Sequence, residues 1–321
     1  MIDRRQLYQR LWQGPMFQRW HWLEWNFAPG RQTPFAQITL DALVRCDAVM
    51  PGYAEAMVTT LEAIGGREHD RDDLERLKQW LGELHVVHHF VTWAWPEQVT
   101  FKREPTAGGS LANPEITITA ADWRLGVEVK TPDLRKLSDG RRSTNPFQVL
   151  ARVDGGPTML PGPVTMPRDN PIKDFLVSAN RKFTGFHATD PGFYGILVIV
   201  WDDFVNEPIS ALLSPASGLF TPNSFHTDRN GSPHTYPCVD AVVLLRQQHQ
   251  FIEGMANRPP LDERRHFLDY GDLDRFPPNA VIPNPHSTHP VSDSLVGALQ
   301  AWYPQPTMGG EYVPAELVIW T

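Results

Sequence analysis

Apolar and polar residues alternate in two short stretches of the chain, residues 115–121 and 125–131. This period-two alternation is typical of strands that bury one face. The polar residues between the two stretches predict a tight turn, and therefore an antiparallel hairpin. The aliphatic side chains of both strands then share the buried face, and Glu115, Glu128 and Lys130 share the opposite one.

The position of the turn sets which residues face each other across this hairpin. Asp122, Trp123 and Arg124 are the polar turn candidates, and a turn centred between Asp122 and Trp123 places Glu115 opposite Lys130. Glu128 then lies diagonal to Glu115. We therefore expect two carboxylates and one ammonium group to gather on the polar face.

Hydrophobic periodicity predicts the other elements of the same region. Residues 71–93 and 171–183 carry apolar side chains at spacings of three and four, which is typical of amphipathic helices. Residues 97–103 have strand character, and the apolar runs 194–201 and 239–245 are typical of strands covered on both faces. The order is helix, three-strand meander, helix, strand, strand, which predicts an α/β fold with a mixed (α+β) sheet.

Composition divides the chain into three regions. Residues 1–66 are rich in aromatic side chains and contain a helical stretch from Leu40 to Ile64, whereas residues 67–254 hold the predicted sheet. Residues 255–321 are rich in proline, a composition that does not easily form a core of its own. We expect an N-terminal helical region, a central core and a C-terminal extension that wraps the core or binds a partner.

The loop predicted from residue 132 to residue 169 has little periodicity, and its first half is basic because of Lys136, Arg141 and Arg142. Long loops within a domain are usually functional or mobile. A substrate-contacting loop and a plain surface insertion both fit this segment.

Charge and cysteine content limit the function classes. The formal net charge of −8 argues against a protein that coats nucleic acid by charge alone. The two cysteines, Cys46 and Cys238, form no metal or redox motif. No apolar run is long enough to cross a bilayer, and the N-terminus does not resemble a signal peptide, so we expect a cytoplasmic protein without a membrane association.

The polar face of the hairpin has the composition of a metal-dependent hydrolytic site. Two neighbouring carboxylates repel each other unless a cation lies between them, and Mg²⁺ is commonly held by one or two carboxylates together with water and substrate phosphate. A neighbouring lysine can position or activate the attacking water and stabilise charge that develops on phosphorus. These groups suit the hydrolysis of phosphodiesters.

Pro114-Glu115 followed by Glu128-Val129-Lys130 on the next strand resembles the signature of the PD-(D/E)xK nuclease superfamily. Glu115 stands where members of the superfamily more often have aspartate. The resemblance implies a restriction-endonuclease-like core and a Mg²⁺-dependent endonuclease, with Mn²⁺ as a substitute metal. It also implies a nucleic-acid substrate, DNA rather than RNA, and a role in restriction, antiviral defence or DNA processing.

The resemblance assigns roles to individual residues. Glu115 and Glu128 are the expected metal ligands, and Lys130 is expected to orient or deprotonate the attacking water. Superfamily members sometimes supply a further acid from the preceding helix, and Glu83 is the candidate here, with an ordinary solvated glutamate as the alternative. Three basic residues are candidates for binding substrate phosphate: Lys102, Arg103 and Lys182.

Three other interpretations remain open from the sequence. The hairpin can be a half-exposed pair of strands with a surface ion pair. The protein can be a catalytically inactive nuclease-fold module that binds a protein partner or a second copy of itself. Third, His85 and His88 have a spacing that allows transition-metal binding, although packing roles for these histidines and His89 are the simpler interpretation.

Overall fold

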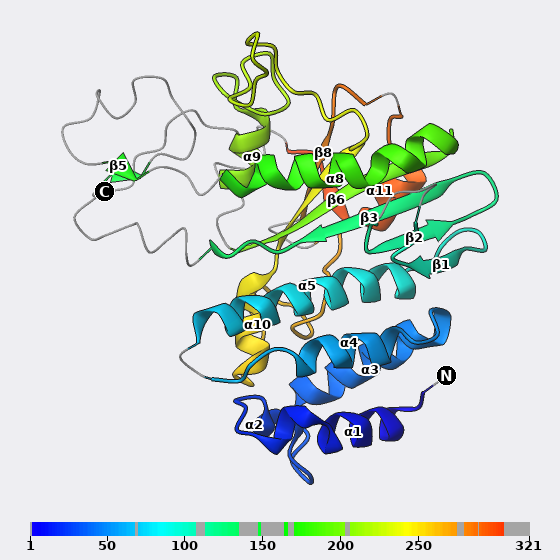
Figure 1. The fold of residues 1–321 in the computed structure, drawn as a ribbon, viewed down its shortest axis with the longest axis vertical. Helices are drawn as coiled ribbons and strands as arrows, with labels where there is room; N and C mark the ends of the chain where they lie inside the picture. The colour runs from blue at the N-terminus through cyan, green and yellow to red at the C-terminus, as the bar shows by residue number, and fades with distance from the viewer. Residues whose placement is uncertain are drawn as a thin grey trace.

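The fold is described from a computed structural model of the chain (Figure 1). The structure describes residues 2–67, 70–106, 113–134, 147–148, 164–165, 170–202, 206–274, 279–287 and 289–304. The basic loop with Lys136, Arg141 and Arg142 lies outside these residues.

A mixed sheet forms the centre of the molecule. Within the described residues it has seven strands in the order β1-β2-β3-β6-β7-β8-β9. The strands are β1 (Thr100–Arg103), β2 (Ile116–Thr119), β3 (Arg124–Lys130), β6 (Phe193–Trp201), β7 (Ala241–Arg246), β8 (Asn279–Pro283) and β9 (Ala301–Trp302). A separate pair, β4 (Phe147–Gln148) and β5 (Val164–Thr165), is parallel. The predicted α/β class with a mixed sheet is therefore confirmed.

The strand directions follow the predicted connections. β1, β2 and β3 form an antiparallel meander, and β6 is parallel to both of its neighbours, β3 and β7. Residues 196–201 of β6 are fully buried, as expected for an apolar strand covered on both faces. β8 adds antiparallel to β7 from within the proline-rich region, so part of this extension completes the sheet.

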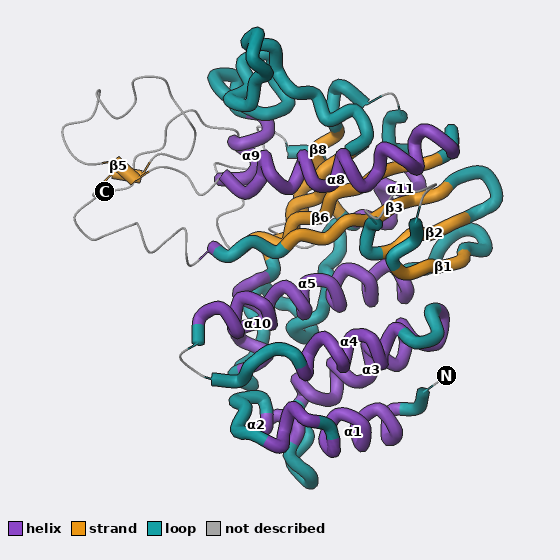
Figure 2. Tube along the Cα trace, viewed as in Figure 1, coloured by secondary structure: helices purple, strands orange, loops and turns teal. Residues whose placement is uncertain are grey.

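Helices cover both faces of the sheet (Figures 1 and 2). α5 (Arg71–Thr92) lies along one face and α8 (Asn170–Thr189) along the other. On the far side of α5 lie the N-terminal helices. The other helices of the described residues are α1 (Arg4–Gln13), η1 (Pro15–Gln18), α2 (Glu24–Phe27), α3 (Pro34–Val49), α4 (Tyr53–Glu62), α9 (Asn206–Leu213), α10 (Gln248–Met255) and α11 (Asp293–Leu299).

Local sequence explains where the main helices begin. The Asp70 carboxylate accepts the backbone N–H groups of Asp72 and Asp73 at 3.1 and 3.3 Å, which caps α5 one residue before the predicted start. Thr33 caps α3, and Pro34 occupies the first turn, where its missing N–H costs nothing. Pro51 and Gly52 separate α3 from α4, so the helical stretch predicted from Leu40 to Ile64 is divided between two helices.

Alternating side chains on the strands pack into two hydrophobic layers, one on each face of the sheet. Leu125, Val127 and Val129 of β3 join the core on the α5 side, which also takes in buried residues from the N-terminal helices and from α11. Leu197 and Ile199 of β6 face α8 instead, where they meet Phe183. The N-terminal region and part of the proline-rich extension thus share one core with the sheet.

The hairpin register differs from the predicted one. Ile116 pairs with Val127, where the prediction placed Val129, and the loop is centred between Ala121 and Asp122. The cause lies at Arg124, which belongs to β3, pairs with Thr119 and donates from Nε to the Thr119 hydroxyl at 3.3 Å. Because the shift is two residues, every side chain keeps its predicted face.

None of the helices in the described residues combines the length and the apolar character that a membrane-spanning segment needs.

Candidate functional site

The last residues of β3 extend beyond the strand β2 that pairs with the rest of it. β3 pairs with β6 along its whole length, from Arg124 to Lys130, but its pairing with β2 ends at Val127. Glu128, Val129 and Lys130 therefore extend past the start of β2. Glu115, the residue before β2, donates its backbone N–H to the carbonyl of Val127 at 3.0 Å, which places it beside Glu128.

Glu128 is the buried centre of the group. Its residue is 0% exposed, and its carboxylate receives two ammonium groups. Lys130 Nζ lies 2.5 Å from Oε1, and Lys182 Nζ from α8 lies 2.7 Å from Oε1 and 2.8 Å from Oε2. A carboxylate withdrawn from water this completely requires such partners, since an isolated buried charge would be strongly destabilising.

Glu115 is the second acid and is only partly buried. Its Oε1 lies 3.9 Å from Lys182 Nζ, so the same lysine contacts both acids. Burial raises the pKa of Glu115, repulsion from Glu128 raises it further, and Lys182 and Lys130 act in the opposite direction. The two carboxylates therefore lie close enough to repel each other.

Glu83 reaches the same group from α5, on the other side of the sheet. The pKa of Glu83 is raised to about 8, mainly by burial and next by repulsion from Glu115. Glu128 raises this pKa by a smaller amount, and Arg103 lowers it. Close packing of α5 on β3 places Glu83 beside these acids. A Cβ added at Gly82 would lie 2.2 Å from the Thr131 hydroxyl oxygen, so only glycine permits this approach.

A pocket of about 440 Å³ opens beside these groups. Glu83, Glu115 and Lys130 line it, and Trp80, Val129 and Phe175 are among its apolar lining residues. Arg76 and Gln79 of α5 also line this pocket. The polar groups therefore border a space large enough for a small ligand or for a segment of a larger one.

The other predicted phosphate-binding residues lie on opposite faces of β1. Lys102 is exposed and pairs with Thr117, whose face of the sheet is that of Glu128. Arg103 lies on the α5 side, where its guanidinium carbon is 5.8 Å from the centre of the Tyr53 ring and its Nη2 donates to Glu104 at 2.9 Å. Lys182 is placed against the acids, so it is the one of the three that contacts the predicted metal ligands.

The three acids do not form a compact ligand set. Within the part of the chain that the structure describes, Glu83, Glu115 and Glu128 are not a group whose carboxylate oxygens all approach within 4.8 Å of one another. Lys182 lies between Glu115 and Glu128. A bound dication would therefore have to compete with this ammonium group.

His85 and His89 of α5 pack against Tyr270. The His89 ring stacks on Tyr270 with centroids 3.6 Å apart, and its Nε2 lies 2.7 Å from the carbonyl of Ala298. His85 stacks on the same tyrosine from 5.2 Å, and burial lowers its pKa well below the ordinary value. These contacts favour the packing interpretation over zinc binding by His85 and His88.

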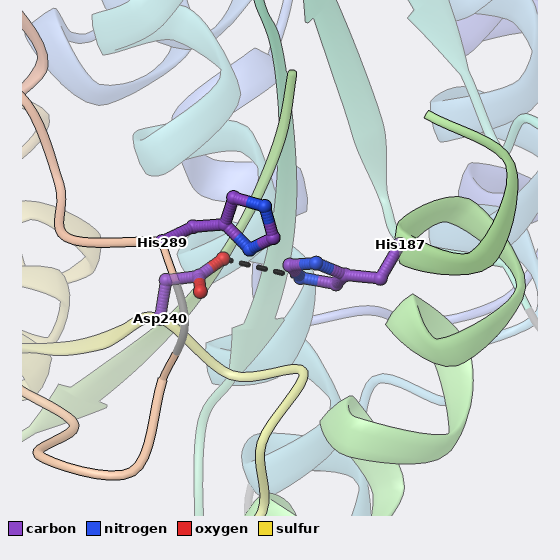
Figure 3. A group of neighbouring side chains, drawn as sticks. All are labelled: His187, Asp240 and His289. Atoms are coloured by element: carbon purple, nitrogen blue, oxygen red, sulfur yellow. Dashed lines mark ion pairs between the residues drawn. The ribbon is translucent and has the colours of Figure 1, made fainter. Parts of the chain in front are cut away.

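A second polar cluster, which the sequence did not predict, lies near the far end of α8 (Figure 3). His187, Asp240 and His289 each offer a ligand atom, and these atoms lie within 4.8 Å of one another. Wide sequence separation hides the cluster, because His187 and His289 are far apart in the chain and belong to no spacing motif. Asn180 of α8 accepts the backbone N–H of Cys238 at 2.9 Å near this second cluster.

Comparisons with family models, with curated proteins and with solved structures find no match to this chain. The relation to the nuclease superfamily thus remains a proposal that is based on the motif and on the arrangement of its residues.

Proposed function

We propose that the protein is a metal-dependent nuclease of the PD-(D/E)xK type that hydrolyses phosphodiester bonds, in DNA rather than RNA. The observation that carries the proposal is the convergence of Glu83, Glu115, Glu128 and Lys130 at the open end of β3, from two strands and a helix. The order of α5, the meander, α8 and β6 is also the order of the restriction-endonuclease-like core. A cytoplasmic location and a role in defence or DNA processing belong to the same proposal.

The oxygen donors of the site suit a hard dication, provided that Lys182 gives up its contact with Glu128 and the acids draw closer together. Carboxylate oxygens are the ligands that Mg²⁺ prefers, and Mn²⁺ accepts the same donors. The raised pKa values of Glu83 and Glu115 show that negative charge is costly here, and a cation would relieve that cost. When bound, Mg²⁺ would neutralise phosphate charge and act as a Lewis acid.

The acids and lysines of the site would have separate roles in metal binding and in catalysis. Glu115 and Glu128 would hold the metal, with Glu83 as a third acid that becomes a ligand once its proton leaves. Lys130 lines the pocket and contacts Glu128, so its ammonium group is positioned to orient the attacking water or to stabilise charge on the phosphate. Lys182 would move from Glu128 toward substrate phosphate when the metal takes its place.

A specific observation favours a second candidate function. Glu128 is already compensated by two ammonium groups, which is the arrangement expected of an inactive nuclease fold that has replaced its metal by lysine. Such a protein would act as a binding or assembly module, with a protein partner or a second copy. The acidic net charge of −8 agrees with this alternative.

One digestion panel separates the two functions. The purified chain is incubated with supercoiled plasmid, single-stranded DNA and RNA, each with Mg²⁺, with Mn²⁺ and with EDTA. We expect metal-dependent cleavage of DNA that EDTA stops. Intact substrates under every condition, from a folded preparation, would reject the nuclease and leave the binding module.

A further inference from the structure

The cluster of His187, Asp240 and His289 joins three separate elements of the fold. His187 lies in the last turn of α8, Asp240 directly precedes β7, and His289 lies between β8 and α11. Figure 3 shows both imidazole rings directed toward the Asp240 carboxylate. One nitrogen from each ring and one carboxylate oxygen lie within 4.8 Å of one another.

Asp240 is fixed before any ligand arrives. It is 1% exposed, and its Oδ2 accepts the backbone N–H of Gly195 at 2.6 Å. The Ser287 hydroxyl donates to Oδ1. These bonds hold the carboxylate in one orientation, which is how hydrogen-bond partners outside a metal's ligand set orient a ligand.

His187 is also held in position by its surroundings. Its Nε2 lies 3.2 Å from Asp240 Oδ2 and 3.1 Å from the carbonyl oxygen of Cys238. The ring meets the edge of Phe193 with centroids 5.1 Å apart. The His289 ring is 5.2 Å from the His187 ring and nearly perpendicular to the Tyr194 ring, so both imidazoles are restrained by aromatic neighbours.

Two imidazoles and one carboxylate are a donor set for a borderline transition metal. Zn²⁺ binds histidine nitrogen and carboxylate oxygen in tetrahedral sites, whereas Mg²⁺ prefers oxygen ligands only. Binding through Nε2 of His187 would require this nitrogen to present its lone pair to the metal and to give up its contact with the Cys238 carbonyl. The fourth position would be left to water.

We propose that His187, Asp240 and His289 form a zinc site that ties the end of α8 to the segment between β8 and α11. The site is separate from the acid and lysine group, because no residue is shared between them. It stabilises the fold by linking segments that are remote in sequence, and it does so whether or not the protein is a nuclease.

The test uses the full-length protein, stripped of metal with a chelator and then titrated with Co²⁺ and with Zn²⁺. The wild type should bind one equivalent, give the visible absorption of four-coordinate Co²⁺, and melt at a higher temperature with Zn²⁺. His289→Ala removes a ligand from a partly exposed position, so the variant should fold. Loss of a hydrogen-bond partner of a metal ligand lowers metal affinity by up to roughly 100-fold. Loss of the ligand itself should lower the affinity of His289→Ala by at least as much.

His286→Ala is the matched control, since His286 is exposed on the same segment and lies outside the cluster. It should bind Co²⁺ and Zn²⁺ as the wild type does, and so should Glu115→Gln. The proposal would be overturned if the wild type bound only a small fraction of an equivalent of Co²⁺ or Zn²⁺. So would wild-type affinity in both His289→Ala and Asp240→Asn, because the metal would then sit elsewhere.

Discussion

Two buried carboxylates, Glu128 and Asp240, lie on the α8 side of the sheet and differ in their partners. Glu128 faces two lysine ammonium groups beside an open pocket, whereas Asp240 faces imidazole, a hydroxyl and a backbone N–H. Ammonium partners cannot bind a metal, but they can support phosphate chemistry. Imidazole partners can themselves be metal ligands, so similar burial leads to different chemistry.

Removing the Glu128 carboxylate should have the largest effect. Glu128→Ala leaves Lys130 and Lys182 close together without their shared partner, and we expect a loss of about 3–5 kcal/mol in the free energy of unfolding. Urea unfolding followed by circular dichroism measures it. The matched control is Glu24→Ala, at an exposed glutamate, which should change stability by less than about 0.5 kcal/mol. Equal stability of the two variants would contradict the buried ion-pair description.

Glu128→Ala also tests the independence of the two regions. If the Asp240 cluster is separate, a stripped and refolded Glu128→Ala protein should still bind one equivalent of Co²⁺ below its melting temperature. Loss of Co²⁺ binding in a variant that circular dichroism shows to be folded would mean that the two regions are coupled.

Gly82→Ala should have the next largest effect. The added methyl group would clash with the Thr131 hydroxyl and push α5 away from the end of β3, at a cost of about 1–3 kcal/mol. Because α5 carries Glu83, the variant should also lose nuclease activity. Gly297→Ala is the control: its Cβ meets no atom within 4 Å in α11, so stability should stay within about 1 kcal/mol of the wild type and tend to increase.

Glu83 provides a pH test with a smaller effect. Its pKa is raised from 4.5 to about 8, so the folded protein keeps a proton that the unfolded chain has released. The free energy of unfolding should therefore fall as pH rises through this interval and level off above it. Glu83→Gln should flatten that slope, as thermal melts across the interval would show. An unchanged slope in the variant would place the titration elsewhere.

The elements with strong periodicity were predictable from the sequence. The apolar stripe predicted α5 almost to the residue, and the apolar run predicted β6. The hairpin register was predicted incorrectly, because a shift of two residues leaves the alternation of faces unchanged. The polar face nevertheless collects Glu115, Glu128 and Lys130, since it depends only on that alternation.

The features that could not be predicted depend on contacts between segments that are far apart in the sequence. β8 was missed because Asn279–Pro283 offers only a short apolar run within a proline-rich region, and it becomes a strand by pairing with β7. The Asp240 cluster was missed for a related reason. Its members come from three distant segments, and only the packing of α8 against the sheet brings them together.

The most direct test of the central claim is the rate of Mg²⁺-dependent DNA cleavage by Lys130→Ala. Lys130 lines the pocket and contacts Glu128, so its loss should slow cleavage by about 100-fold or more while the circular dichroism spectrum stays that of the wild type. Lys173→Ala, at a lysine of α8 paired with Asp174, should cleave at the wild-type rate. Cleavage by Lys130→Ala at the rate of Lys173→Ala would contradict the assignment of this site.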